Sequence, residues 1–315
     1  MARFVQYTAF GGPEVLEVVE GEVPRAGEGE VVVELRAIGV NPIDGKLRSG
    51  TRASAPLTEP RTTGTDGAGV IVAVGDGVTG WAVGDEVVAT SVRGSYATHA
   101  VVPVRGLTPK PAALGWAQAA GIGIPAGTAY QALRSLGVGP GMTVLVNAAS
   151  GSVGQAAVQF ARELGARVVG TASPANHDRL RQLGAIPVSY GDGLVDRVRA
   201  IAPEGVDRAL DAAGTDEAIE ASIELTGDPR HVGTIVRGAD APRWGIQAWS
   251  GGSPVPLDAE QVAWRAEGVR LAAERAAAGE FDVEIARTLP LERAADAQRM
   301  LEDGTAPRGK IVLLP

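Results

Sequence analysis

The sequence has no cysteine and few histidines. Among its 315 residues the three imidazole side chains are His99, His177 and His231. Without thiols the chain can form no disulfide, no cysteine nucleophile and no thiolate metal site. The histidines do not form an H-x₃₋₄-H or H-E-x-x-H pair, the spacings that are typical of zinc sites. We therefore expect no structural or catalytic metal.

The sequence also lacks an excess of positive charge and a long apolar run. Its formal net charge is −8 and its pI is ≈ 5.1, which argues against a nucleic-acid or anionic-membrane partner. Because it has no apolar signal segment and no apolar span of about 20 residues, we expect a soluble, cytoplasmic protein. Hydrophobic residues make up 45% of the chain, which is enough for sizeable cores. The length allows about two domains.

The clearest pattern that is present runs from residue 143 to residue 184. A short β-branched run, Thr143–Val146, predicts a buried parallel strand. Apolar residues at helical spacing follow a turn of small residues, and Gly165 stands where that helix should end. A second strand is expected at residues 166–171. Together these segments predict one βαβ unit.

The turn inside this unit matches the dinucleotide fingerprint G-x-G-x-x-G, with alanine in the place of the first glycine. A glycine at the second place lets a pyrophosphate approach the backbone, and the third lets the helix pack closely on the strand. An isolated match is weak, but this one lies between a predicted strand and a predicted helix. We predict that the turn binds a dinucleotide through Ala149, Ser150, Gly151, Ser152, Val153 and Gly154.

The end of the second strand indicates which dinucleotide binds. An NAD site carries Asp or Glu about 20 residues past the glycines, where it accepts from the ribose 2′-hydroxyl. Ser173 occupies that place, and no carboxylate occurs before Asp178. Small, neutral or basic residues that can hydrogen-bond a 2′-phosphate surround it, so we predict NADPH. Arg179 and Arg181 could instead lie on a solvated helix face. These neighbours are Asn176, His177, Arg179 and Arg181.

The rest of the chain divides into a β-rich part and an alternating part. Residues 1–118 predict a small barrel-like domain, and residues 41–50 a polar loop or short helix inside it. Residues 112–136 have a helical pattern, broken by Gly121, Gly123, Pro125 and Gly127. Strands and helices then alternate as in a doubly wound parallel sheet. The last strand, Lys310–Leu314, has no place in that sheet, and we expect it to return to the N-terminal domain. The expected later strands are 186–190, 206–211, 231–236 and 245–249.

Ordered blocks along the whole chain resemble the quinone oxidoreductase (zeta-crystallin-like) group, the zinc-free branch of the medium-chain dehydrogenase/reductase superfamily. The Gly-His-Glu motif of the zinc-binding branch is missing. The blocks that carry the resemblance are Phe10–Leu16, Gly39–Asp44, Arg48–Gly50, Gly64–Ile71, Ala126–Tyr130, Ala148–Gly154, Leu183–Ala185 and Arg308–Leu313.

The resemblance implies an α/β fold with two domains. Residues 1–120 and 280–315 would form a GroES-like catalytic domain, and residues 121–279 a Rossmann domain that binds NADPH. Members of the group use NADPH to transfer a hydride to quinones and other activated C=C bonds, including α,β-unsaturated carbonyls. They commonly pair as homodimers across the edge strand of the Rossmann domain, which here would be residues 245–249.

The resemblance also implies site residues, and each has a plainer alternative. Asn41 and Thr128 would face the nicotinamide, with Asp44 nearby; Asp44 and Thr128 could instead cap helices. Lys46 stands where several relatives have a tyrosine, and it would either donate to an enolate or lie in solvent. Tyr130 offers a hydroxyl or a core aromatic ring. No proton donor is assigned, and solvent could supply the proton. Further implied coenzyme contacts are Tyr190, Ala213, Gly214, Gly238 and Arg308.

Three function classes follow from these residues. The first is an NADPH-dependent reductase of quinones or enones. The second is an enoyl-thioester reductase of CoA or carrier-protein substrates, which would need a basic path such as Lys46, Arg48, Arg52 and Arg61. The third is an NADPH-binding protein without redox turnover. An alcohol dehydrogenase is disfavoured, because that branch stabilises the alkoxide with a zinc ion that this chain is not expected to hold.

Overall fold

The predicted βαβ unit lies at the centre of a parallel sheet. A computed structural model describes residues 1–52, 54–249, 253 and 255–315. In it β9 (Thr143–Asn147) runs parallel to β10 (Arg167–Thr171), with Thr143 opposite Arg167, and α3 (Ser152–Glu163) connects them. Gly165 follows α3 with φ of +83°, a conformation that glycine adopts without strain and that ends the helix. The prediction for this segment is confirmed.

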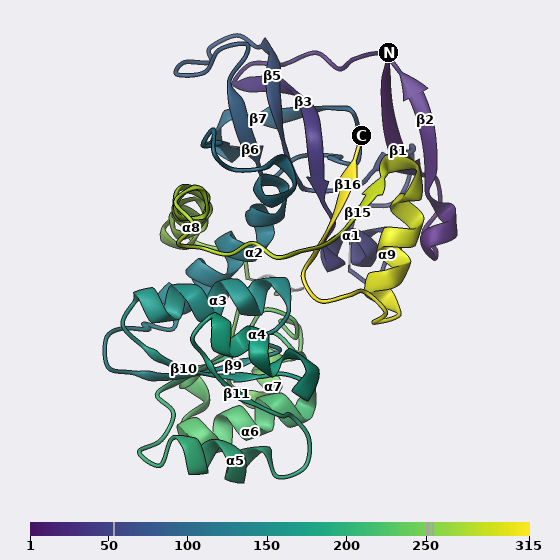
Figure 1. Ribbon diagram of the computed structural model, residues 1–315. Helices are drawn as coiled ribbons and strands as arrows, with labels where there is room; N and C mark the ends of the chain where they lie inside the picture. The colour runs from purple at the N-terminus through teal and green to yellow at the C-terminus, as the bar shows by residue number, and fades with distance from the viewer. Residues whose placement is uncertain (53, 250–252, 254) are drawn as a thin grey trace. The chain divides into compact units, whose positions relative to one another are not determined.

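This sheet is doubly wound, as expected. Its strand order is β11-β10-β9-β12-β13-β14, so the order reverses beside β9. Figure 1 shows α3 and α4 on one face of the sheet and α5 and α6 on the other. The later strands are shorter than predicted. The remaining elements are β11 (Ile186–Val188), β12 (Arg208–Asp211), β13 (Val232–Thr234), β14 (Gln247–Ala248), α4 (His177–Gln182), α5 (Leu194–Ile201), α6 (Asp216–Thr226) and α7 (Ala241–Trp244).

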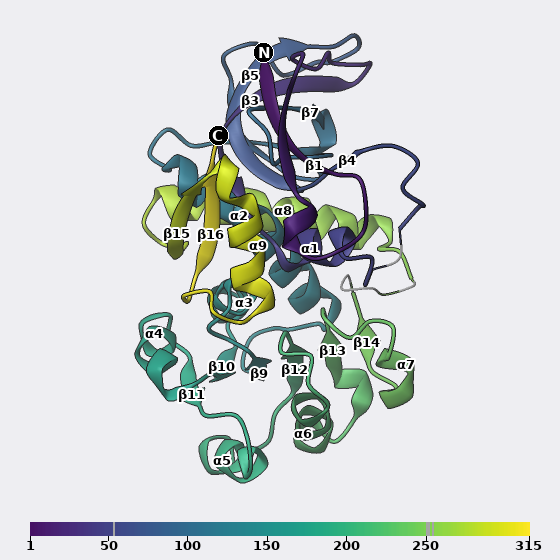
Figure 2. The ribbon, with the colours of Figure 1, turned by 90° about the vertical axis from the view of Figure 1, so that its right-hand side faces the viewer.

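Both chain ends contribute to a second, mixed sheet, in which β16 (Lys310–Leu314) pairs antiparallel with β3 (Glu30–Gly39). The predicted return of the last strand is therefore confirmed, and Figure 2 shows the two termini in the same part of the molecule. The order is β15-β16-β3-β5-β6-β8, and β7 also pairs with β3. Its other strands are β15 (Ile285–Pro290), β5 (Asp66–Val74), β6 (Glu86–Ala89), β8 (Leu107–Pro109) and β7 (His99–Pro103).

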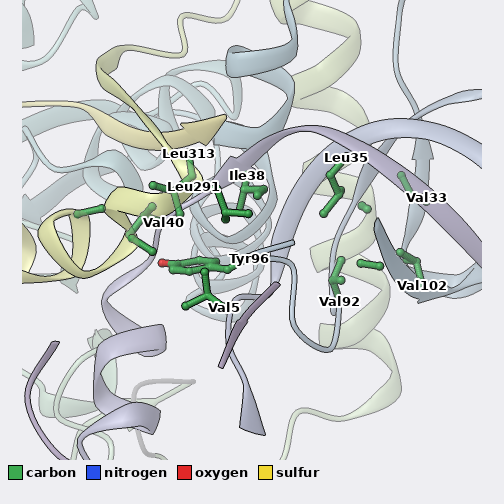
Figure 3. Packing of buried hydrophobic residues seen from close by; sticks show 14 of the residues in the cluster. Val5, Val33, Leu35, Ile38, Val40, Val92, Tyr96, Val102, Leu291 and Leu313 are labelled. Carbon is green, nitrogen blue, oxygen red and sulfur yellow. The ribbon is translucent and has the colours of Figure 1, made fainter. Parts of the chain in front are cut away.

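A core of buried side chains holds this sheet to a smaller one, β2-β1-β4. Val5 from β1, Ile38 from β3 and Leu313 from β16 pack together around the Tyr96 ring (Figure 3). All four side chains are at least 99% buried, so each contributes close to its full hydrophobic stabilisation, about 1.5–3 kcal/mol for an aliphatic side chain. The smaller sheet consists of β1 (Ala2–Tyr7), β2 (Glu17–Gly21) and β4 (Arg61–Thr62).

The chain forms two units. Residues 1–124 and 269–315 make up the first, which contains α1 (Pro42–Arg48) and α9 (Ala294–Glu302), and residues 125–268 make up the second. Among the described residues, no helix combines the length and the apolar character needed to cross a membrane.

The expected break between residues 121 and 127 was wrong, because α2 (Trp116–Ser135) continues through it. Pro125 removes one backbone donor, and Asp66 binds the helix at the same point. The Ile124 N–H donates to Asp66 Oδ2 at 2.8 Å. A Cβ on Gly123 would overlap the Asp66 carboxylate. Tertiary contacts thus outweigh the weak local preference. The other long helix, α8 (Ala259–Ala277), also forms where the pattern predicts one.

Candidate functional site

The turn after β9 is fixed by bonds to the neighbouring strand. The Ala149 N–H donates to the Thr171 carbonyl at 2.9 Å, and the Ala148 N–H to the Thr171 hydroxyl at 3.1 Å. Ala148 has a φ of +52°, a left-handed conformation that a non-glycine residue adopts at some cost in energy. A Cβ on Gly170 would come within 2.8 Å of the Ala149 side chain, so β10 needs a glycine where it passes the turn.

The two glycines of the turn are required for different reasons. A Cβ on Gly154 would overlap the Ala148 carbonyl oxygen, so the close approach of α3 to β9 needs glycine there. A Cβ on Gly151 would have its nearest neighbour at 3.5 Å, an ordinary contact, and φ there is −73°. The fold itself therefore tolerates a side chain at Gly151. The absence of one leaves space for a ligand at the helix N-terminus.

The N-terminus of α3 provides backbone donors at this space. The first bond inside the helix runs from the Gln155 N–H to the Gly151 carbonyl, at 2.8 Å. Helix geometry gives the preceding N–H groups, those of Ser152, Val153 and Gly154, no acceptor within the helix. Such groups, together with the helix dipole, favour a phosphate. The start of α3 therefore has backbone donors that can bind a phosphate group, as the sequence predicts for this turn.

The side chains of Gln155 and Arg179 fix the position of Ser150 in the turn. Gln155 Nε2 donates to the Ser150 carbonyl at 2.9 Å, and Arg179 Nε donates to Gln155 Oε1 at 2.8 Å. Arg179 is buried with 8% of its surface exposed, so it does not lie on a solvated helix face. Sequence reasoning missed this role, because an arginine near a helix start reads as a surface residue.

The segment after β10 lies beside the same turn. Asn176 Nδ2 donates to Ser173 Oγ at 3.2 Å and to Ser150 Oγ at 3.3 Å. A ring nitrogen of His177 lies 3.3 Å from the Ala172 carbonyl oxygen. Asn176 thus links Ser150 to Ser173, so the structure brings together three of the residues that the sequence predicts to bind the coenzyme. Asp178 pairs with Arg181 at 2.6 Å, and both side chains are exposed.

The other implied coenzyme contacts of the second unit vary in exposure. The N–H groups of Ala213 and Gly214 both donate to Asp211 Oδ1 at 2.9 Å, at the carboxyl end of β12. Tyr190 is 63% exposed just after β11, whereas Thr128 is buried inside α2 and does not cap a helix. Gly238 has no room for a side chain, because a Cβ there would overlap the backbone of the residue at position 253.

In the first unit, Asn41 lies inside a buried polar cluster. Lys310 Nζ donates to Asn41 Oδ1, while Asn41 Nδ2 donates to Asp66 Oδ2 at 3.1 Å and to the Gly39 carbonyl at 3.3 Å. Both amide N–H groups are therefore committed to protein acceptors. The side chain is only 1% exposed. Arg308, next to this cluster in sequence, pairs with Glu284 at 2.7 Å.

Asp44 belongs to the same cluster and caps α1. Its Oδ2 accepts from the Asn41 N–H at 2.9 Å and from the Tyr96 hydroxyl at 3.0 Å. Burial raises its pKa to about 7, Asp66 adds to the rise, and the Asn41 N–H and Lys310 oppose it. Burial likewise lowers the pKa of Lys310 against the pull of the two carboxylates. The geometry supports the helix-cap alternative for Asp44, because a fully buried carboxylate has no open path to a substrate.

Tyr130 is a core residue of the second unit. This supports the alternative that it serves as a core aromatic ring and not as a catalytic hydroxyl. Its ring packs edge-on against Phe160, with centroids 5.1 Å apart. Arg134 Nη1 donates to its hydroxyl at 3.0 Å. The side chain is 6% exposed, and a Cβ on Gly268 would meet it at close range. The structure thus gives its hydroxyl a structural bond.

Lys46 lies on the wall of a cavity of about 500 Å³ in the first unit. Arg48 and Glu302 border the same cavity and form an ion pair there. Arg48 is fully buried, and its Nε donates to Gln298 Oε1 at 2.7 Å. Lys46 is half-buried, and it is the candidate catalytic residue that lines this cavity.

Comparison with known proteins places these features in a family. Residues 27–112 match the family described as "Alcohol dehydrogenase GroES-like domain", and residues 183–313 match "Zinc-binding dehydrogenase". Quinone oxidoreductase of Sus scrofa is 33% identical over 323 residues, which cover 97% of this chain and 95% of the relative. The chain belongs to the quinone oxidoreductase family.

Two further relatives support this assignment. Human quinone oxidoreductase is 43% identical over 175 residues, which span about half of each chain, 55% of this one and 53% of the human protein. The Escherichia coli quinone oxidoreductase, solved in complex with NADPH, has a TM-score of 0.84 at 27% identity, covering 99% of this chain and 100% of that one. The described residues contain no group of three or more His, Asp or Glu side chains that could hold a metal ion.

Proposed function

We propose that this chain is an NADPH-dependent reductase that transfers a hydride to quinones, and to activated C=C bonds such as those of α,β-unsaturated carbonyls. The observation that carries the proposal is the turn at the N-terminus of α3. There Gly154 is demanded by packing, whereas Gly151 leaves open space beside backbone donors. Backbone donors at the positive end of a helix favour the negative charge of a pyrophosphate.

The choice of NADPH rests on the segment after β10. Its side chains near the turn, Ser173, Asn176 and His177, carry no negative charge that would repel a 2′-phosphate. The solved Escherichia coli relative binds NADPH, in line with this choice.

The proposed reaction asks three things of the chain. NADPH, when bound, supplies the hydride. The turn residues hold the pyrophosphate, and the segment after β10 holds the phosphorylated ribose. A donor must also stabilise the negative charge that develops on the substrate oxygen, and one such donor is worth about 3 kcal/mol. Both Asn41 N–H groups are engaged elsewhere, so we assign this role to Lys46 on its cavity wall.

We also propose that the protein is a homodimer that pairs along β14. This strand is the edge of the parallel sheet, and one side of it carries backbone groups for a second copy. Light scattering coupled to size-exclusion chromatography tests this proposal: a monomer at micromolar concentration would refute it.

The enoyl-thioester alternative has less support. It needs a chain of basic residues for a phosphate, but Arg48 is buried in an ion pair. Arg61 donates to the hydroxyl of Ser54 and to two carbonyl groups of its own loop, and its guanidinium lies over the Phe10 ring. Two of the four residues of the proposed basic path are therefore engaged by the protein itself, which weakens the case for a phosphorylated substrate.

NADPH oxidation, followed by absorbance, tests the function against a benzoquinone, a naphthoquinone, an enone and a crotonyl thioester. We expect turnover with the quinones and the enone. Preference for the thioester would favour the alternative reductase. Tight NADPH binding with no turnover on any substrate would favour a non-redox role. A protein that binds no NADPH would refute the proposal.

A further inference from the structure

We infer that Arg179 positions the pyrophosphate-binding turn and does not bind the 2′-phosphate of the coenzyme. This inference rests on the proposed function. It assigns a specific role to a basic residue at the site where an NADPH-binding protein is expected to recognise the 2′-phosphate. Its basis is a continuous chain of hydrogen bonds from Arg179 through Gln155 to the main chain of Ser150.

The first step is the direction of the Arg179 side chain. Its Nε donates to Gln155 Oε1 at 2.8 Å, and the residue is more than nine-tenths buried. A guanidinium presents its donors in one rigid plane. Once its Nε is directed at a buried glutamine, the orientation of the whole group is set by the interior of the protein. A phosphate in solvent contact would have to compete with that arrangement.

The second step is the effect on Gln155. Because Arg179 donates to the amide oxygen, the amide nitrogen of Gln155 must point the other way. That nitrogen donates to the Ser150 carbonyl at 2.9 Å. A side-chain amide can rotate by half a turn and exchange its oxygen and nitrogen, and Arg179 disfavours the rotated state. Arg179 thereby selects the orientation in which Gln155 can hold the turn.

The third step is the effect on the turn. The Ser150 carbonyl is held by Gln155, and the N–H of the same peptide group, that of Gly151, donates to the Ala148 carbonyl at 3.1 Å. Both ends of this peptide plane are therefore fixed. Gly151 is the N-cap of α3, so the plane determines where the helix begins and where its first free N–H groups point. Donors fixed in advance bind an anion without a cost of ordering.

The inference predicts which part of the coenzyme depends on Arg179. A positioning residue for the turn affects every ligand that carries a pyrophosphate, including ADP, NADH and NADPH, by the same factor. A ligand for the 2′-phosphate affects 2′-AMP and NADPH and leaves ADP and NADH unchanged. The two roles therefore give opposite results with ADP and 2′-AMP.

Calorimetric titration of the full chain with these four ligands tests the inference. Arg179→Met should weaken ADP, NADH and NADPH by a common factor of about ten or more, the scale of one lost charge-assisted bond, and leave 2′-AMP within about twofold. Gln155→Glu keeps an acceptor for Arg179 but has no N–H for the Ser150 carbonyl, so it should give the same pattern. Arg199→Met is the control: it removes an exposed ion pair between Arg199 on α5 and Glu224 on α6, and it should change nothing.

Three results would overturn the inference. Selective loss of 2′-AMP and NADPH in Arg179→Met would make Arg179 a phosphate ligand. Unchanged binding of all four ligands in both Arg179→Met and Gln155→Glu would show that the chain of hydrogen bonds is not needed for coenzyme binding. If Arg179→Met does not fold, Gln155→Glu decides alone. A wild-type protein that binds none of the ligands would refute the proposed function itself, and with it this inference.

Discussion

Lys310 donates to the side-chain oxygen of Asn41 although 269 residues separate them in the chain. The bond joins the last strand, β16, to the start of α1, and it fixes the Asn41 amide with its nitrogen toward Asp66. An ammonium group gives up its hydration when buried, and the surrounding oxygens must replace it. The cluster thus ties the two ends of the chain together through polar groups as well as through the core.

Removal of this ammonium should destabilise the first unit strongly. Lys310→Met removes a buried cation that interacts with the carboxylates of Asp66 and Asp44, and removing one member of a buried charge cluster costs about 3–5 kcal/mol. Arg270→Met removes one exposed partner of Glu274 and should cost less than about 1 kcal/mol. Urea unfolding of both variants measures the difference. Equal stabilities would mean that Lys310 is hydrated in solution and does not hold Asn41.

Asp44 should make stability depend on pH between about 4 and 7. Its folded pKa of about 7 lies above the ordinary aspartate value of 3.8, so the folded state keeps a proton that the unfolded state has lost. Stability should therefore fall as pH rises through this window, by about 4 kcal/mol at 1.36 kcal/mol per pKa unit, and level off above it. Asp228 and Asp296, whose pKa values are lowered, act in the opposite direction below this window.

The variant Asp44→Asn directly tests whether Asp44 causes this dependence of stability on pH. Asparagine keeps an oxygen for the Asn41 N–H and the Tyr96 hydroxyl but carries no charge. The variant should be more stable than wild type at about pH 8 and show a smaller change between pH 5 and 8 in urea titrations. Asp178→Asn, at an exposed position, is the control. A slope that persists in Asp44→Asn would have to come from other groups.

The two glycines of the turn should separate folding from binding. Gly151→Ala places its Cβ 3.5 Å from the nearest atom, so we expect an unchanged melting temperature but NADPH binding weaker by about tenfold or more. Gly154→Ala would overlap the Ala148 carbonyl, and overpacking of this kind costs about 1–3 kcal/mol. Thermal unfolding and NADPH titration are measured on both variants. A Gly151→Ala protein that binds NADPH normally would remove the turn as the pyrophosphate site.

Lys46 should act on the chemical step. Lys46→Met removes the ammonium from the cavity wall, and loss of one donor to a developing oxyanion lowers kcat/KM by about two orders of magnitude. The NADPH dissociation constant should not change, because the coenzyme cradle lies on α3. Lys46→Arg keeps the charge and should retain part of the activity. Wild-type kinetics in Lys46→Met would indicate a solvated lysine and leave the donor unassigned.

The sequence predicted the elements whose signals are local. The β9–α3–β10 unit follows from apolar periodicity and from Gly165, and the return of β16 follows from counting the strands that the parallel sheet can hold. Its weakest predictions concern charged side chains. Arg48 reads as part of a basic surface loop, yet its partners Gln298 and Glu302 lie 250 and 254 residues away. The spacing of residues along the chain does not predict contacts between residues so far apart.

The candidate site shows the same limit. The turn residues could be named because each glycine has a steric role that a motif encodes. The roles of Asn41 and Arg179 depend on which distant side chains meet them, and here these are Lys310 and Gln155. The continuity of α2 past Pro125 likewise depends on Asp66, which lies on β5, far from α2 in the sequence. Burial of polar groups is decided by tertiary partners, and a single sequence does not reveal them.

Coenzyme preference should follow the charge at position 173. Ser173 lies within hydrogen-bonding distance of Asn176, which also reaches the turn at Ser150. Wild type should bind NADPH more tightly than NADH. Ser173→Asp adds a negative charge that repels a 2′-phosphate but accepts from a 2′-hydroxyl, so NADPH should bind about tenfold or more weakly and NADH no worse. Ser173→Asn, a neutral control of similar size, should keep the NADPH preference. Fluorescence titration with both coenzymes gives the ratio, and equal or tighter NADH binding by the wild type would reverse the assignment.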